Sequence, residues 1–341
     1  MEHKAPGLLV LWLTNDCNLG CRYCYADAGR KKESMTLDTA IRAVGRMGQE
    51  GFKLQLAGGE PLMNMVLVRK LYEYITEKGI RASLRLQTNG TLITPEIAGE
   101  IRRMRIAVGV SLDGGIDANE ALRGGTAEVL KGIRHLAAEG VGVNLNCVLT
   151  GQNIESLPGL VDLAFYLGNV KGVGIDLLRR AGRAVKNEVP PARADQIGQA
   201  LREAYTRTLE LERASGRRIY IREIEEAKKR LKAGKGCREY CYAACGRAMV
   251  VLPGGNVWPC GSLVGIEGYF MGNVMEGEVA PLALKGGRDS ACGGCRYETL
   301  CPGGCPSRLI LNCGAATRQS QDCALRKTAF EIAEEEINAC I

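Results

Sequence analysis

Apolar and polar positions alternate in blocks along the first half of the chain, and each block has the length of a strand or a helix. Short apolar runs typical of strands occur at 8–14, 53–59, 83–89, 106–114, 141–150 and 170–178. Between them, stretches such as 36–51 and 64–79 carry apolar residues at helical spacing and end at glycine. The pattern predicts repeated βα units in a parallel sheet or barrel, with too few units for a closed eight-stranded barrel.

The pattern changes after these units. Residues 179–195 are rich in glycine, proline and charge, which indicates a connection between modules. Two helices are predicted over 193–232 and a closing helix over 324–338. We therefore predict an α/β partial barrel over 1–180, a helical linker over 181–236, a cysteine-rich domain over 237–323 and a C-terminal helix over 324–341. The cysteine-rich part has little apolar periodicity, so we expect its fold to depend on metal.

Composition narrows the classes of function. The 341 residues, 46% of them hydrophobic, are typical of a globular protein. The net charge of +7 is spread along the chain without a basic and aromatic module, which argues against a nucleic-acid partner. No apolar run reaches the roughly 18 residues of a membrane span, and no signal peptide is evident. We expect a cytoplasmic protein with no membrane partner.

The 15 cysteines are the clearest chemical signal. In a protein expected in the cytosol, with only two histidines, clustered cysteines indicate metal ligands rather than disulfides. Nearly all of them lie in two groups, at 17–24 and 237–323. The two groups predict separate metal sites.

The first group holds only three cysteines, in the stretch CNLGCRYC: Cys17, Cys21 and Cys24. It follows the first predicted strand, at the end where barrel-like folds assemble their active sites. Three thiolates can hold three irons of a [4Fe-4S] cluster and leave the fourth iron open, whereas a structural zinc site would need a further ligand such as His3. The open position favours a catalytic site.

This stretch, with Tyr23 before its last cysteine, resembles the hallmark motif of the radical S-adenosylmethionine (radical SAM) superfamily. The resemblance implies a partial (β/α)6 TIM-like barrel in which S-adenosylmethionine (SAM) binds the open iron. It also implies an electron from a flavodoxin- or ferredoxin-type reductant, cleavage of SAM, and a 5′-deoxyadenosyl radical that abstracts hydrogen from the substrate.

Three further motifs match this family at the ends of successive predicted strands: AGGEPL at 57–62, QTNG at 87–90 and SLDG at 111–114. Taken singly, Asn-Gly and Asp-Gly are ordinary turn signals, but together the motifs strengthen the resemblance. It implies that the residues that contact SAM are Tyr23, Gly58, Gly59, Glu60, Thr88, Asn89, Ser111 and Asp113. Glycines let a ligand approach the backbone closely, and a carboxylate accepts from the SAM ammonium group.

The second group of cysteines resembles a SPASM domain, an accessory module of radical SAM enzymes. The spacing is Cys245-x9-Gly255-x4-Cys260, then Cys292-x2-Cys295-x5-Cys301-x3-Cys305, then Cys323. Residues 249–260 are predicted to form a hairpin that brings Cys245 and Cys260 together. The resemblance implies two auxiliary [4Fe-4S] clusters, and so three clusters in all.

By the same resemblance, the first auxiliary cluster would be held by Cys245, Cys260, Cys305 and an upstream cysteine. The second would be held by Cys292, Cys295, Cys301 and Cys323. Cys237 and Cys241 both qualify as the upstream ligand, and we favour Cys241 because it lies one helical turn before Cys245. Cys313 is a spare thiol or a substitute for Cys323.

Three functions are compatible with these motifs. The first is an enzyme that modifies a peptide or protein, making a thioether or carbon–carbon crosslink or oxidising a side chain, with auxiliary clusters that accept an electron or bind substrate. The second is a radical SAM enzyme of haem-biosynthesis type, acting on a tetrapyrrole or another small molecule. The third is an iron–sulfur electron carrier or a zinc-stabilised binding module, which would not need the open three-cysteine site. We favour the first.

Two features bear on the first function. Only 16 residues precede Cys17, so we expect no N-terminal leader-binding domain, and recognition would rest on residues 179–235 or on a separate leader-peptide-binding protein. Gly261 follows Cys260 where sulfatase-maturing members typically carry an aspartate that acts as a base, which argues against that activity. No catalytic residue is assigned. Candidates for a general base near the pocket are Asp176, Arg179, Arg180 and Tyr242.

Overall fold

A computed structural model describes residues 7–48, 51–234, 240–284, 287, 292–313 and 320–339. Within these residues the strands form one sheet in the order β10-β9-β8-β1-β2-β3-β4-β5-β6-β7. The strands are β1 (Leu8–Trp12), β2 (Phe52–Ala57), β3 (Ala82–Thr88), β4 (Ala107–Ser111), β5 (Val143–Leu149), β6 (Val170–Leu177), β7 (Tyr220–Ile221), β8 (Ala248–Val251), β9 (Asn256–Trp258) and β10 (Gly272–Asn273). Neighbours from β1 to β7 are parallel, which confirms the predicted partial barrel.

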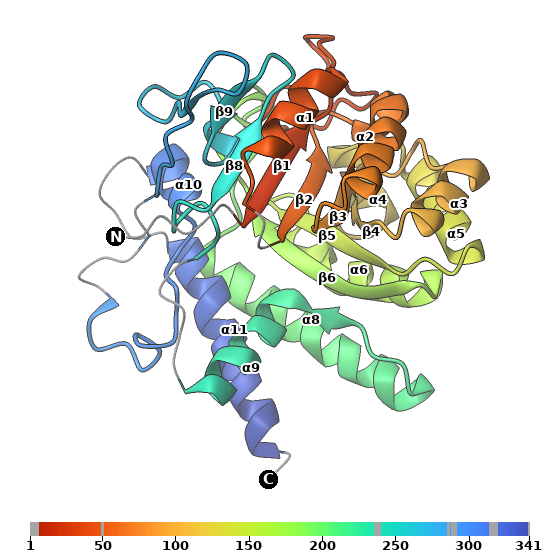
Figure 1. Ribbon diagram of the computed structural model, residues 1–341. Coiled ribbons are helices and arrows are strands. Elements are labelled where there is room, and N and C mark those ends of the chain that lie inside the picture. The colour runs from red at the N-terminus through yellow and green to blue at the C-terminus, as the bar shows by residue number, and fades with distance from the viewer. Residues whose placement is uncertain are drawn as a thin grey trace.

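Helices cover the outer face of this sheet (Figure 1). These are α1 (Leu37–Gly45), α2 (Met65–Glu77), α3 (Pro95–Arg103), α4 (Ile116–Leu122), α5 (Thr126–Ala138) and α6 (Leu157–Leu167). The other helices are α7 (Arg183–Lys186), α8 (Ala194–Ser215), α9 (Arg222–Ala233), α10 (Pro306–Arg308) and α11 (Ser320–Ala339). Capping explains the predicted start at Thr36, whose hydroxyl accepts from the Thr39 amide at the start of α1, whereas Asn64 at the predicted start of α2 makes no side-chain cap hydrogen bond. Thr94 caps α3 in the same way as Thr36, by accepting from the Ile97 amide.

The apolar core lies between the sheet and these helices. In β2 every second residue is buried, so that Leu54 and Leu56 join the core while Gln55 faces the concave side. The period of two along the strand therefore fills one face with leucine and leaves the other polar. The concave face, with the strand ends above it, is where a ligand can enter.

The predicted hairpin is present, and it joins the barrel sheet. β8 and β9 are antiparallel, and β8 pairs in parallel with β1, where Leu8 lies opposite Ala248 and Leu11 opposite Val251. Figure 1 shows this hairpin beside β1. The cysteine-rich part is thus anchored to the barrel by backbone hydrogen bonds between β8 and β1, and Cys260 follows β9 on this side of the barrel.

The C-terminal helix crosses the two linker helices (Figure 1). Glu336 of α11 accepts from Tyr205 of α8 at 2.6 Å, and it pairs with Arg218 at 2.9 Å and with Lys228 of α9 at 2.5 Å. α11 begins at Ser320, four residues before the predicted start, so that Cys323 lies in its first turn. No helix in the described part of the chain has both the length and the apolar character that a membrane span requires.

Candidate functional site

A cavity of about 370 Å³ lies at the C-terminal ends of the barrel strands. It is lined by nine residues that the motifs predicted: Cys17, Cys21, Tyr23, Cys24, Gly58, Gly59, Thr88, Asn89 and Ser111. The same cavity is lined by Cys260, Gly261 and Ser262 from the segment after the β8–β9 hairpin. The structure thus places the three-cysteine loop and one cysteine of the C-terminal group around a single space.

Two glycines allow the three-cysteine loop to pack on the end of β2. The amide of Gly59 donates to the Thr14 carbonyl at 2.8 Å, and the amide of Glu60 donates to the Asp16 carbonyl at 2.9 Å. A Cβ at Gly58 would overlap the Thr14 carbonyl oxygen, and a Cβ at Gly59 would overlap that of Asp16. Gly58 also has a φ of 135°, a conformation that glycine adopts readily. These glycines therefore position the cysteine loop in addition to lining the cavity.

We expect Gly59→Ala to displace the cysteine loop and lower the iron content of the reconstituted protein by up to about four atoms, one [4Fe-4S] cluster. Gly20→Ala is the matched control, because Gly20 lies in the same loop and a Cβ there would meet no atom within 4 Å. Iron and sulfide analysis checks both variants. Full iron loading of Gly59→Ala would show that the loop tolerates the added methyl group.

Glu60 and Asp113 lie behind the cavity wall instead of in it. Glu60 is fully buried, and its carboxylate accepts from the Thr88 hydroxyl at 2.6 Å and from the amides of Asn89 and Leu62 at 2.7 and 3.1 Å. Burial raises the pKa of Glu60, and these three donors oppose the rise. In the geometry seen here Glu60 fixes the residues that line the cavity, so its direct contact with SAM stays a prediction.

Tyr23, Asp113 and Arg123 form a buried polar cluster at the cavity. The Tyr23 hydroxyl donates to Asp113, and Arg123 donates to the Tyr23 oxygen at 2.6 Å. Asp113 also accepts from the Val148 amide at 2.8 Å. Arg123 lines the cavity, and its Nε atom is buried without a hydrogen-bond partner among the described residues. Nothing in the sequence around Arg123 indicated this place, since it depends on how α4 meets the cysteine loop.

The start of α7, after β6, holds the cysteine loop from its other side. Arg183 donates through Nε to the Cys21 carbonyl at 2.9 Å and through Nη1 to the Ala28 carbonyl at 2.8 Å. The Arg183 amide donates to the Cys24 carbonyl at 2.9 Å. The segment predicted as a connection therefore supports the site directly.

Four of the C-terminal cysteines line one further cavity: Cys292, Cys295, Cys301 and Cys323. These are the four cysteines predicted to hold the second auxiliary cluster. Tyr297 and Phe330 stack in its wall, with ring centroids 4.8 Å apart. An apolar wall of this kind shields a cluster from solvent, which is one determinant of its reduction potential.

Of the cysteines predicted for the first auxiliary cluster, Cys260 lines the cavity at the strand ends, and Cys305 lies 3.9 Å from Arg179, which also lines it. Cys241 is an exposed residue, yet desolvation of its thiol raises its pKa to about 11, and the nearby Cys305 and Cys260 thiols add to the rise. Cys245 contacts the carbonyl of Tyr242 at 3.3 Å. Cys237, the alternative upstream ligand, lies outside the described residues, as does the side chain of Cys313. The assignment of all these ligands stays a prediction.

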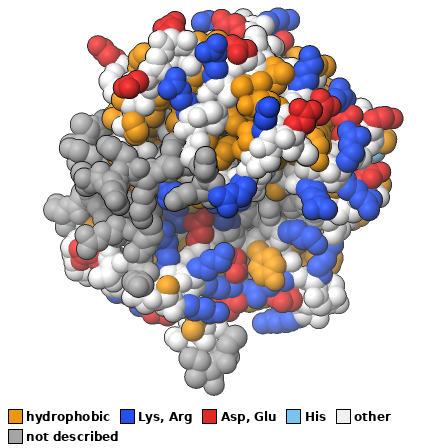
Figure 2. All heavy atoms as spheres, in the orientation of Figure 1, with side chains coloured by type: hydrophobic (Ala, Val, Ile, Leu, Met, Phe, Trp, Pro, Cys, Tyr) orange, Lys and Arg blue, Asp and Glu red, His pale blue; other side chains and the backbone are white. Residues whose placement is uncertain are grey.

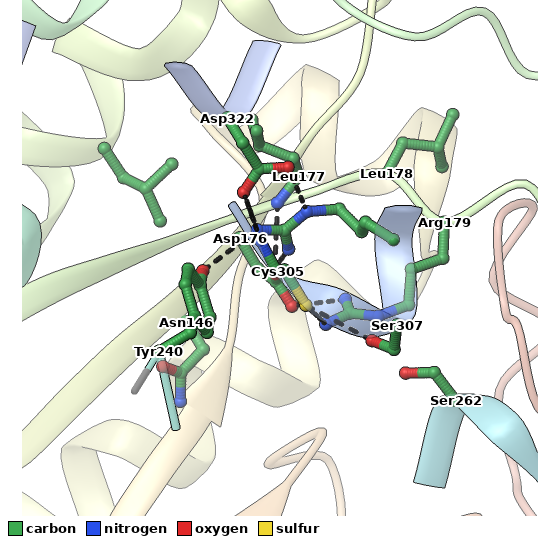
Figure 3. Close-up of polar contacts among 12 residues, drawn as sticks. Asn146, Asp176, Leu177, Leu178, Arg179, Tyr240, Ser262, Cys305, Ser307 and Asp322 are labelled. Atoms are coloured by element: carbon green, nitrogen blue, oxygen red, sulfur yellow. Dashed lines mark hydrogen bonds and ion pairs between the residues drawn. The ribbon is translucent and has the colours of Figure 1, made fainter. Parts of the chain in front are cut away.

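Charged residues connect the cavity to the cysteine-rich part (Figure 3). Asp176 and Arg179 line the cavity and pair at 2.6 Å, and Arg179 Nη2 lies 3.9 Å from Cys305 Sγ. Arg308 pairs with Asp176 and with Asp322, whose carboxylate also accepts from the Cys305 amide at 3.1 Å. One buried guanidinium thus holds together the end of β6, α11 and the Cys305 segment.

The network decides among the candidates for a general base. Desolvation raises the pKa of Asp176, but the guanidiniums of Arg179 and Arg308 outweigh this effect and hold that pKa well below its usual range. Asp176 is therefore a weak base. Arg180 is exposed, and its amide donates to Asn312. Tyr242 lies under Lys53 near Gly7, at the opposite end of the strands. Asp176 and Arg179 are therefore the two candidates that reach the cavity, and catalytic residues stay unassigned.

Comparison with known proteins agrees with this geometry. Residues 13–164 match the family model described as the radical SAM superfamily. This part of the chain is therefore a radical SAM domain. An AdoMet-dependent heme synthase of Methanosarcina barkeri is 28% identical over 95% of this chain and 97% of that protein. A PqqA peptide cyclase of a Methylobacterium species is 28% identical over 94% of this chain and 86% of that protein.

The fold likeness extends through the cysteine-rich part. A solved structure of anSMEcpe with bound AdoMet and Cp18Cys peptide has a TM-score of 0.80, covers 98% of both chains, and is 21% identical. At 21% identity this similarity is evidence for the fold alone. The family match over residues 13–164 supports a radical SAM enzyme, and that family uses SAM and a [4Fe-4S] cluster.

The donor set at the cavity fits such a cluster. Burial raises the pKa of Cys17 to about 11 and also raises that of Cys21, so thiolates there need a compensating metal charge. Within the described residues, no three His, Cys, Asp or Glu side chains converge closely enough to hold a single metal ion. A cluster spreads its thiolates over several irons, and the three cysteines around one cavity leave room for a ligand at the remaining iron.

Proposed function

We propose that this radical SAM enzyme modifies a peptide or protein substrate, forming a thioether or carbon–carbon crosslink or oxidising a side chain. The observation that carries the proposal is the shared cavity: the three-cysteine loop and Cys260 of the C-terminal group line one space. A substrate held there would lie between the SAM site and the first auxiliary cluster. The peptide-cyclase relative and the fold shared with a peptide-bound structure support a peptide as the substrate.

In this proposal the cysteine loop holds the [4Fe-4S] cluster, which with bound SAM supplies the 5′-deoxyadenosyl radical. Gly58, Gly59, Thr88, Asn89 and Ser111 line the SAM pocket, and Tyr23 contributes its ring. Cys241, Cys245, Cys260 and Cys305 hold the first auxiliary cluster, and Cys292, Cys295, Cys301 and Cys323 hold the second. The reductant is of flavodoxin or ferredoxin type, and a separate protein binds the leader of the substrate. The proposal also keeps the predicted division into a partial barrel over 1–180, a helical linker over 181–236, a cysteine-rich domain over 237–323 and a C-terminal helix over 324–341.

Arg123 is well placed to receive the carboxylate of SAM. Its guanidinium lies in the cavity wall, its position is fixed by Tyr23 and Asp113, and its Nε has no partner among the described residues. A buried guanidinium with a free donor is a strong carboxylate ligand.

We expect Arg123→Met to weaken SAM binding about tenfold or more, since a charge-assisted hydrogen bond contributes about 1.5–3 kcal/mol. Equilibrium dialysis of SAM against the reconstituted protein measures this change. Arg123→Lys, which keeps the charge and loses the planar fork, should give an intermediate affinity. If Arg123→Met binds SAM as tightly as the wild type while retaining its iron, another group receives the carboxylate.

A second candidate is a reaction on a tetrapyrrole, because the heme synthase relative matches the chain over as great a length as the peptide cyclase does. The two are separated by adding SAM, a reductant and either a pool of synthetic peptides or coproporphyrin III. The proposal expects 5′-deoxyadenosine release to rise with a peptide, together with a peptide product lighter by two hydrogens for a crosslink or oxidation. A rise with the porphyrin alone would favour the second candidate.

A further inference from the structure

A second cavity, of about 500 Å³, lies on the concave face of the sheet. It shares Gln55 and Gln87 with the SAM cavity, so the two spaces are neighbours across these side chains. Ala107, Gly109, Gly172 and Gly174 lie on its walls. A closed barrel fills this interior with layers of branched apolar side chains. Here small residues leave it hollow.

One row of residues across the sheet makes the hollow polar. Its members are in register on five successive strands: Gln87, Gly109, Asn144, Gly172 and Tyr220. A Cβ at Gly109 would come within 2.6 Å of the Gln87 amide oxygen and 2.7 Å of the Asn146 amide nitrogen. Glycine at this point therefore makes room for two amide side chains.

These amides form a chain of hydrogen bonds between the two cavities. Gln87 donates to the Ser111 hydroxyl at 3.0 Å, Asn146 donates to Gln87 at 2.7 Å, and Arg222 approaches Asn146 at 3.4 Å. Arg222 is itself paired with Glu223 at 2.6 Å. Gln87 lines both cavities and Ser111 lines the SAM cavity, so Gln87 and its hydrogen bond to Ser111 connect the two spaces.

Two cations line this cavity without a counter-charge. Arg85 lies on β3, and no acidic side chain is among the residues that line the space. Lys171 lies at a register shift in β6: Val143 is opposite Val170 and Asn144 is opposite Gly172, which leaves Lys171 as the extra residue of a bulge. Successive residues of a regular strand point to opposite faces, but a bulge changes the direction of a side chain. Lys171 and its neighbour Gly172 therefore both line the cavity. Neither cation has a hydrogen-bond or ion-pair partner among the residues that the structure describes.

Basic side chains also border this region on the surface. On the face shown in Figure 2, Lys and Arg side chains, with Asp and Glu side chains among them, lie over the strands and the helices below them. A cleft with one sign of charge concentrates ligands of the opposite sign. Primary amides beside the cations add donors that can orient a planar anion.

From this we propose that the second cavity is a subsite for a carboxylate of the substrate, held by Arg85 and Lys171 and oriented by Gln55 and Asn144. The inference rests on the proposed function, since it takes the space next to the SAM cavity as the place of the substrate. It names the substrate's chemistry: an anionic molecule whose carboxylate lies on the concave face while the reacting carbon reaches the SAM cavity. Acidic peptide side chains and tetrapyrrole propionates are the two sources of this group.

The test measures binding by fluorescence, without a reductant, on the anaerobically reconstituted protein with SAM present. The first probe is a fluorescein-labelled peptide of alternating glycine and glutamate, compared with its glycine–glutamine counterpart. The second is coproporphyrin III, which carries propionate groups, compared with its tetramethyl ester. We expect one of the anionic probes to bind at least about tenfold more tightly than its neutral counterpart.

Arg85→Gln and Lys171→Gln should each weaken binding of that anionic probe by about tenfold, whereas Lys70→Gln on α2 and Arg103→Gln on α3 should leave it unchanged. Both control side chains are exposed and lie outside the two cavities. This pattern with the peptide supports the subsite with an acidic peptide, and with the porphyrin it supports the subsite with a tetrapyrrole. Equal binding of charged and neutral probes, or equal losses in the cavity and control variants, would overturn the inference. Because the assay needs no SAM cleavage, this failure is distinct from a failure of the proposed reaction.

Discussion

Replacing Cys17, Cys21 and Cys24 together by alanine should remove about four irons from the reconstituted protein and bring 5′-deoxyadenosine release down to the level without enzyme. The three cysteines line one cavity on a loop that Gly58, Gly59 and Arg183 hold in place. Without their thiolates the cavity offers no ligand set for a cluster, and SAM loses the metal that it chelates. Iron and sulfide analysis and chromatography of the reaction mixture measure the two effects.

Cys147→Ala is the control for this variant. Cys147 is fully buried in the core on β5, and burial raises the pKa of its thiol, as expected for a thiol that packs as a small apolar side chain. We expect the control to keep both its iron and its activity. A triple variant that retained its iron, or that still released 5′-deoxyadenosine, would contradict the assignment of the three cysteines as cluster ligands.

Arg308→Met should lower the free energy of unfolding by about 3–5 kcal/mol, the cost of removing one partner from a buried ion pair. The Arg308 and Asp322 side chains are both 2% exposed, and Arg308 also pairs with Asp176 and donates to the Tyr240 hydroxyl. Its loss would leave a buried carboxylate without its counter-charge and would release the Cys305 segment from α11. The midpoint of thermal unfolding, measured anaerobically, reports this loss.

Three further variants show whether charge explains the effect. Arg42→Met removes an exposed pair with Asp38 and should cost at most about 1 kcal/mol. Arg308→Lys keeps the charge and should lose less stability than Arg308→Met. Asp322→Asn in the Arg308→Met background should restore part of the stability, because it removes the unpaired charge. If Arg308→Met unfolds at the same temperature as Arg42→Met, the buried network does not stabilise the C-terminal part.

The sequence predicted the barrel because local signals determine it. Alternating burial in β2 and threonine caps before α1 and α3 depend on residues close together in the chain. The cavity could be predicted for a related reason, since the motifs follow strands whose C-terminal ends meet at one edge of a parallel sheet. The family comparison agrees with this fold.

The supporting contacts could not be predicted in this way. Arg123 meets Tyr23 across 100 positions in the chain, and Arg308 meets Asp176 across 132. Such long-range pairs leave no periodicity in the sequence. The motifs also suggested a direct ligand role for Glu60 and Asp113, whereas the structure surrounds both carboxylates with donors from the protein. The glycines and asparagines of β4, β5 and β6 were a readable signal of a hollow interior, because they are too small or too polar to fill a barrel core.

The central claim is that this protein cleaves SAM reductively at a cluster held by its cysteine loop. The most direct test is to reconstitute the wild-type protein anaerobically, count its iron, and measure 5′-deoxyadenosine after adding SAM and a reductant. The account predicts about twelve irons, from three [4Fe-4S] clusters, and release of 5′-deoxyadenosine that depends on the reductant. A protein that holds zinc, or one that holds iron and releases no 5′-deoxyadenosine, would contradict it.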